Sequence, residues 1–304
     1  LIFTKDLEAL ARPPGSQGQG GGGSLTSKPV VETPCFWILL YFYLFHGERS
    51  PILVANGWNH LANPKQGLIM QEQTFSLSAA ESPAAERAAF IRKTYGHLAV
   101  ALLAFAGIEC YLVNSPFAEE MAKSMTEGFT WLIVLGAFMF VGFVADRLAH
   151  SQSSESMQYL GLGLFVVAEA IIFLPLLFVA NEFGEKGVIS TAGIMTLLLV
   201  GGLTATVFIT KKDFSFLRGI LGIGFFVALG FIVCSVLFEF PLAGLLFSSV
   251  MILLAAGSIL YTTSNILHHY HPRQHVAASL ALFSAVALLF WYVLQLLMSF
   301  AGDD

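Results

Sequence analysis

The side chain with the clearest chemical potential is Glu169, which lies in the middle of the apolar run LFVVAEAIIFLPLLFVA. An ionised carboxylate in such surroundings is costly, so Glu169 is expected to be protonated, paired or turned toward a wet cavity. Acids in this setting usually mark an ion or proton path. The alternative is a neutral Glu169 that hydrogen-bonds to a neighbouring helix. Pro175 is expected to kink the same helix.

A second polar group lies in LLAAGSILYTTSNILHHYH at 253–271. At helical spacing, Ser258, Thr262 and Asn265 share one narrow face. Such a face gains nothing from lipid and should point at other helices or at water. Together with Glu169, these residues form our candidate ion or proton path. The alternative for the row is interhelical hydrogen bonding, at roughly 0.6 kcal/mol per bond.

The remaining polar residues favour neither a metal site nor catalysis. Glu109 and Asp146 lie near predicted helix ends, where they can reach the headgroup region. The histidines at 268–275 are interrupted by Pro272 and lack an HExxH or paired-cysteine pattern, so we expect no metal. No intramembrane aspartate pair, GxSxG elbow, Walker motif or dinucleotide fingerprint is present. The sequence predicts a protein that is not an enzyme and needs no cofactor.

The elements that must position these residues are long apolar helices. The chain of 304 residues is 56% hydrophobic and only 12% charged, whereas soluble domains are about 25% charged. Recurrent apolar runs of near twenty residues predict an all-α integral membrane protein with seven transmembrane helices. The predicted spans are 94–113, 130–146, 158–180, 188–210, 218–238, 243–267 and 276–300.

The chain before Met70 differs from the rest. It contains GSQGQGGGGS at 15–24, a linker-like run, and an apolar segment at 35–45 that is too short to span a bilayer. We interpret 1–69 as upstream or artefactual sequence, with the natural start near Met70; the alternative is a genuine, mostly disordered extension with an interfacial segment. The other predicted parts are a cytoplasmic lead at 70–93, the membrane domain at 94–300 and a tail at 301–304.

Lysine and arginine in the loops predict the orientation. One set of loops carries Arg87, Arg92, Lys93, Arg147, Lys211, Lys212, Arg218 and Arg273, and the opposite set carries only Lys123 and Lys186. Because cytoplasmic loops are enriched in these residues, the N-terminus is predicted to be cytoplasmic and the C-terminus to lie outside.

Three stretches together resemble the Bax inhibitor/YccA family of membrane proteins. They are AEAIIFLPLL at 168–177, GLTATVFITKKDFSFLRGIL at 202–221 and GSILYTTSNILHHY at 257–270. The resemblance covers about 85–304 and implies a seven-helix fold in which the other six helices surround the last. Glu169 matches a position where many relatives have Glu, and Asp213 matches the loop motif.

The resemblance implies one of two activities. Some relatives are pH-sensitive calcium leak channels, gated by two aspartates on the sixth and seventh helices that share a proton. The bacterial YccA branch, which the end LLMSFAGDD resembles most, is associated with modulating the membrane protease FtsH. Here Thr262 and Ala285 stand where the aspartates should be, so that gate cannot be carried over. We therefore expect a non-enzymatic regulator in a bacterial inner membrane, with a calcium or proton leak as the alternative.

Overall fold

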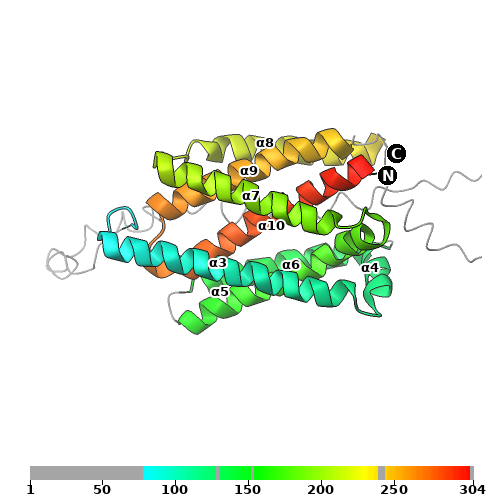
Figure 1. The fold of residues 1–304 in the computed structure, drawn as a ribbon, viewed down its shortest axis with the longest axis horizontal. Helices are drawn as coiled ribbons and strands as arrows, with labels where there is room; N and C mark the ends of the chain where they lie inside the picture. The colour runs from blue at the N-terminus through cyan, green and yellow to red at the C-terminus, as the bar shows by residue number, and fades with distance from the viewer. Residues whose placement is uncertain (1–77, 128–129, 152–153, 239–243, 302–304) are drawn as a thin grey trace, which may run out of the picture.

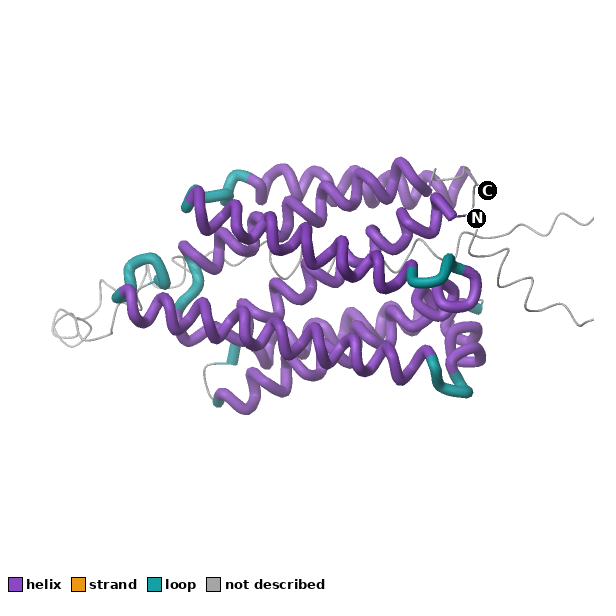
Figure 2. Tube along the Cα trace, in the orientation of Figure 1, coloured by secondary structure: helices purple, strands orange, loops and turns teal. Residues whose placement is uncertain are grey.

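The computed structural model describes residues 78–127, 130–151, 154–238 and 244–301. The extension at 1–69 and residues 302–304 of the predicted tail lie outside these ranges. In chain order the helices are α3 (Ala84–Val113), α4 (Ala118–Thr126), α5 (Thr130–Ala149), α6 (Glu155–Phe183), α7 (Val188–Thr210), α8 (Leu217–Phe238), α9 (Gly244–His268), the 3-10 turn η3 (Pro272–Gln274) and α10 (His275–Ala301). The loops that join them lie at the two ends of the bundle (Figure 2).

Each predicted span coincides with one long helix. The largest difference is in α3, which begins at Ala84 rather than at 94. Its first three turns carry the charges Glu86, Arg87, Arg92 and Lys93, so the helix continues beyond its apolar part. The segment between the first two spans is also not a plain loop. It contains α4, which buries Ala118, Ala122 and Met125 against α5 and α6.

Five helices in the described part of the chain are long and apolar enough to cross a bilayer, namely α3, α6, α7, most of α9, and η3 with α10. The protein is therefore an all-α, multi-pass membrane protein. In α8 the apolar stretch is shorter and covers Leu217–Ala228. That α5 and α8 also cross the bilayer stays a prediction.

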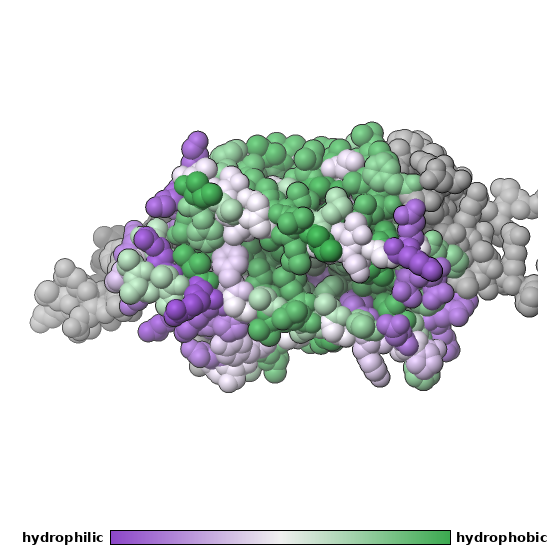
Figure 3. Space-filling model, viewed as in Figure 1, coloured by the Kyte–Doolittle hydropathy of each residue, from purple (hydrophilic) through white to green (hydrophobic). Residues whose placement is uncertain are grey.

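The surface agrees with a membrane setting. Large apolar side chains are exposed along the bundle, including Leu103 on α3, Leu198 on α7 and Leu253 on α9, each more than 70% exposed. On the face shown in Figure 3, hydrophobic side chains form a band with hydrophilic side chains at both ends. Lipid chains would cover such a band.

The last helix forms the centre of the bundle. Residues 275–289 of α10 are all buried, and α10 packs against α3, α5, α6, α7 and α9. Figure 1 shows α10 running between α7 and α9 on one side and α3, α5 and α6 on the other. Its sequence is apolar around its whole circumference, which is the pattern of a helix enclosed by others. The last helix was expected to be surrounded by the other six. In the structure five helices pack against it, and α8 packs mainly against α9.

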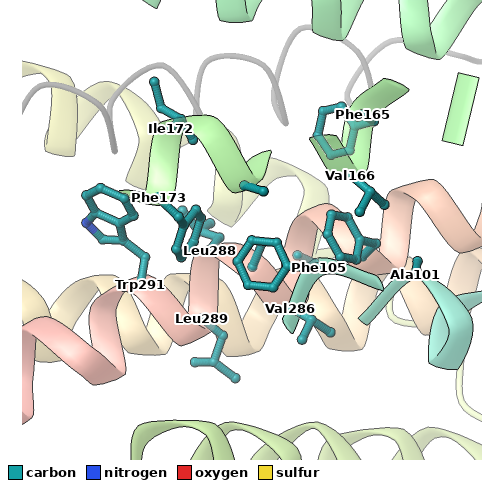
Figure 4. Packing of buried hydrophobic residues seen from close by; sticks show 14 of the residues in the cluster. Ala101, Phe105, Phe165, Val166, Ile172, Phe173, Val286, Leu288, Leu289 and Trp291 are labelled. Atoms are coloured by element: carbon teal, nitrogen blue, oxygen red, sulfur yellow. The ribbon is translucent and has the colours of Figure 1, made fainter. Parts of the chain in front are cut away.

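Aromatic rings fill the space between α3, α6 and α10. The Phe105 ring lies 5.2 Å from that of Phe173 and 5.9 Å from that of Phe283, and the Phe173 ring contacts Trp291 at 4.8 Å (centroid distances). Figure 4 shows Phe105, Phe173 and Trp291 in this cluster. Edge-to-face packing of this kind contributes about 0.5–1.5 kcal/mol per pair beyond the area it buries. The candidate acid Glu169 is one turn before Phe173 along α6 and so lies next to this aromatic cluster.

Candidate functional site

Glu169 is enclosed completely. It lies midway along α6, its side chain is 0% exposed, and neither carboxylate oxygen has a hydrogen-bond partner among the described residues. Pro175, two turns later, is inside the same helix. A full negative charge without donors in this position would carry a large desolvation cost.

A second acid, Glu109, is also buried. Glu109 is in α3, is only 5% exposed, and both of its carboxylate oxygens also lack a partner in the described part of the chain. The sequence predicts that Glu109 reaches the headgroup region, because it is one turn from the end of its helix; the structure buries it instead. Its burial depends on helices that follow much later in the chain, so it leaves no signal in the local sequence.

The polar row of α9 is also mostly internal. Ser258 and Thr262 are each 2% exposed, whereas Asn265 is half-buried. The Ser258 hydroxyl donates to the Leu254 carbonyl oxygen of its own helix at 3.0 Å. The Asn265 carbonyl oxygen accepts the backbone N–H groups of His269 and Tyr270, at 2.7 and 3.0 Å, where α9 ends.

The structure does not gather the four predicted path residues into one cluster. Glu169 is on α6 and the polar row is on α9, and these two helices have no extensive contact because α10 packs against both. The interior therefore holds single buried acids on α3 and α6 and, apart from Glu169, a hydroxyl-bearing face on α9.

The positions of the family's two acids lie on the packed surfaces of α9 and α10. Thr262 is 2% exposed, Ala285 is 0% exposed, and the adjoining Ser284 is also fully buried. The Thr262 and Ser284 hydroxyls have no hydrogen-bond partner among the described residues. Neither position supplies a carboxyl group, so the proton-sharing aspartate pair of the channel-type relatives has no counterpart there.

Asp213 organises the loop between α7 and α8. Its Oδ1 accepts hydrogen bonds from the hydroxyl and the backbone N–H of Ser215, the latter at 2.9 Å, and from the Ser264 hydroxyl of α9 at 3.4 Å. The Ser215 hydroxyl bond, helped by nearby His269 and His268, holds the pKa of Asp213 below its usual value. Asp213 is exposed, so its role is to shape the loop and dock it onto α9.

The histidines of the described ranges make ring and backbone contacts. His275 is 4% exposed, and its ring lies 5.1 Å from that of His97 and 6.4 Å from that of Tyr159. His268 Nδ1 lies 2.9 Å from the Ser264 carbonyl oxygen of its own helix. Within the described ranges, no three His, Cys, Asp or Glu side chains lie close enough together to hold a metal ion.

Comparison with known proteins shows which family this chain resembles. The family model described as "Inhibitor of apoptosis-promoting Bax1" matches residues 87–302. An uncharacterised protein of Pseudomonas aeruginosa is 31% identical over 240 residues, which are 77% of this chain and 100% of that protein. Bax inhibitor 1 of Schizosaccharomyces pombe is 30% identical over 233 residues, 74% of this chain and 82% of its own.

A further relative, matched over a shorter range, has a name that states an activity. The modulator of FtsH protease YccA, from Escherichia coli, is 34% identical over 130 residues, which are 43% of this chain and 58% of YccA. No solved structure matches the chain significantly. The matched range 87–302 contains every long helix of the bundle almost completely. The chain belongs to the Bax inhibitor family of membrane proteins, which includes YccA.

Proposed function

We propose that this protein is a non-enzymatic regulator of membrane-protein quality control that acts on a membrane protease of the FtsH type. The observation that carries the proposal is the 34% identity to YccA, a protein named as a modulator of FtsH protease. The absence of carboxyl groups at Thr262 and Ala285 supports it, since a leak channel gated by an aspartate pair needs both.

The proposed orientation puts the partner at the end of the bundle where α3 begins. The eight Lys and Arg residues of the basic loops lie near helix ends at this side of the bundle. These ends are the start of α3, the ends of α5 and α7, and η3. By the positive-inside rule this end faces the cytoplasm of a bacterial inner membrane, all seven long helices cross the bilayer, and the C-terminus lies outside.

The N-terminal lead is attached to this end. The Ala79 backbone N–H donates to the Tyr270 carbonyl oxygen at 2.8 Å, and Arg87 Nη1 donates to the Ala80 carbonyl oxygen at 3.5 Å. Ala79 and Ser82 are buried there. The deletion used to test the proposal is therefore limited to 70–77, so that the packed segment from Ser78 onward is kept.

The test is crosslinking and co-purification of the full chain from a bacterial membrane, followed by reconstitution with the protease. Full-length protein should capture an FtsH-type protease and change its rate of substrate degradation. Deletion of 70–77 should weaken capture several-fold, whereas Glu119→Gln with Glu120→Gln, at the opposite end, should not. Recovery of no protease, with an unchanged degradation rate, would refute the proposal.

A calcium or proton leak is the second candidate, and the buried carboxyl of Glu169 is what favours it. In the path suggested by the sequence, Glu169, Ser258, Thr262 and Asn265 would line the route. This candidate predicts ion flux in proteoliposomes that falls with Glu169→Gln but not with Glu182→Gln, an exposed acid on the same helix. Flux no greater than that of empty vesicles between pH 5 and 8 would eliminate it.

A further inference from the structure

Three aromatic side chains from three helices meet at the end of the bundle where α3 begins. The ring of His275, the first residue of α10, lies 5.1 Å from that of His97 on α3 and 6.4 Å from that of Tyr159 on α6. The rings of His97 and Tyr159 are 5.2 Å apart, so all three are neighbours (centroid distances). We call these three residues the ring cluster.

The ring cluster lies where α10 is attached to α3. One turn after His275, the Ser279 hydroxyl donates to the Thr94 carbonyl oxygen of α3 at 2.8 Å. Ser279 and Thr94 are both 0% exposed. The start of α10 is therefore held to its neighbours by this hydrogen bond and by the ring contacts.

The close packing of the two imidazole rings favours their neutral forms. Nδ1 of His97 lies 2.6 Å from the Lys93 carbonyl oxygen, so it carries a hydrogen, and Nε2 is the atom that can accept a further proton. His97 is half-buried and His275 is 4% exposed. Protonation of both rings would place two like charges side by side where little water can screen them.

Among the described residues, no carboxylate forms an ion pair with either histidine of the ring cluster. On α3, the charged residues within two turns of His97 are Arg92 and Lys93, both exposed. On α6, Glu155 lies one turn before Tyr159 and is exposed. The helix α7 has no titratable side chain, and η3 brings the exposed cation Arg273.

The titratable groups of the other two helices packed on α10 have their own contacts. On α5, Asp146 Oδ1 lies 3.2 Å from Nδ1 of His150, and the Arg147 guanidinium lies over the Phe143 ring at 5.0 Å. On α9, Nδ1 of His268 lies 2.9 Å from a backbone carbonyl oxygen of its own helix. Positive charge added to the ring cluster would thus meet nearby cations and no paired acid.

We propose that the ring cluster is a pH-sensitive clasp on the start of α10. While both imidazole rings are neutral, they pack with Tyr159 and hold α10 against α3 and α6. As pH falls below about 6.5, where histidines ordinarily titrate, the rings gain charges that repel each other and Lys93, and the start of α10 loosens. The clasp uses other residues than the aspartate pair of channel-type relatives, and it does not depend on the partner proposed above.

A proton suits this cluster better than a metal ion. Imidazole nitrogens are common metal ligands, but a structural zinc ion takes about four ligands in a tetrahedral arrangement. Within the described ranges, no third His, Cys, Asp or Glu side chain completes such a set with His97 and His275. Protonation requires only the ring nitrogens themselves.

Hydrogen exchange measured by mass spectrometry tests the clasp in the purified full chain. After correction for intrinsic rates, backbone amides at 94–98 and 275–280 should exchange several-fold faster at pH 5.5 than at pH 7.5. His97→Phe and His275→Phe each keep a ring and remove a proton site, so each should reduce this acceleration. His269→Phe, at an exposed histidine of the same end, should retain it. Equal corrected exchange at both pH values in the wild type, or an undiminished acceleration in both ring variants, would overturn the proposal.

Thermal unfolding in detergent decides the case if His275→Phe does not fold, because the half-buried position of His97 tolerates a phenylalanine more easily. The unfolding temperature should fall from pH 7.5 to pH 5.5 by less in His97→Phe than in the wild type and in His269→Phe. An equal fall in all three proteins would show that another group senses the pH, and would refute the clasp.

Discussion

The backbone N–H of Phe214 donates a 2.9 Å hydrogen bond to the hydroxyl oxygen of Ser264, which joins the α7–α8 loop to α9. Ser264 is 0% exposed and also donates to Asp213 at 3.4 Å. One side chain thereby satisfies a loop amide and an acid that are about fifty positions away in the sequence. The TKKDFS segment and the TTSN segment, far apart in the sequence, thus meet at this contact.

Ser264→Ala should destabilise the protein by about 1–3 kcal/mol, because it leaves the Phe214 N–H without its acceptor. Thermal unfolding in detergent measures the change. Ser249→Ala is the matched control, since that hydroxyl donates only to the Leu245 carbonyl oxygen of its own helix. An equal effect of the two substitutions would show that the loop contact contributes nothing.

Asp213 gives the loop a defined pH response. Its pKa is lowered in the folded protein, chiefly by the Ser215 hydroxyl, so its stabilising effect is present above the unfolded value of about 3.9 and is lost as pH falls through the folded value. Hydrogen exchange at Phe214 and Ser215 should stay slow from pH 8 to 5, after correction for intrinsic rates, and accelerate only below about pH 4. Asp213→Asn should remove that acid transition; its persistence would assign it to another group.

Gly161 marks a close approach of α5 and α6. A Cβ atom there would lie 2.5 Å from the Ala145 carbonyl oxygen and 2.7 Å from the Ala149 nitrogen, both backbone atoms that cannot move aside easily. Gly161→Ala should therefore cost about 1–3 kcal/mol or more. Gly163→Ala, two residues later, meets nothing within 4 Å and should stay within about 0.5 kcal/mol of wild type. Similar unfolding temperatures for the two variants would contradict the close approach.

Aspartates at the two positions where channel-type relatives carry them should give this protein a pH-dependent calcium leak. Thr262→Asp combined with Ala285→Asp places two carboxyl groups at buried positions on helices that pack together. The double variant should show a pH-dependent calcium flux in proteoliposomes, several-fold above that of wild type and of either single variant. A folded double variant without such flux would show that the rest of this interior cannot conduct.

The helices were predictable because their signal is local. Apolar runs near twenty residues place α6, α7, α8 and α9 within about three residues of their observed ends. The start of α3 was missed because Arg92 and Lys93 end the apolar run while the helix continues. The helix α4 was missed because nine residues with only a few apolar positions resemble a loop until α5 and α6 are there to cover them.

The site was only partly predictable, since its contacts are not local. Glu169 reveals itself by its apolar neighbours in the sequence, and its burial is confirmed. Glu109 does not, because its depth depends on α6 and α10, which follow much later in the chain. Likewise, nothing in the row Ser258, Thr262 and Asn265 indicates that α10 separates it from Glu169. That these residues conduct an ion stays a prediction.

The central position of α10 has a consequence for how the protein is made. The ribosome completes this helix after all five helices that pack against it, so the faces that α10 covers stay open until the last part of the chain is made. The buried interior is therefore complete only in the full-length chain. Pulse-labelled chains truncated before Pro272 should be degraded faster than complete ones, and equal lifetimes would argue against this order of assembly.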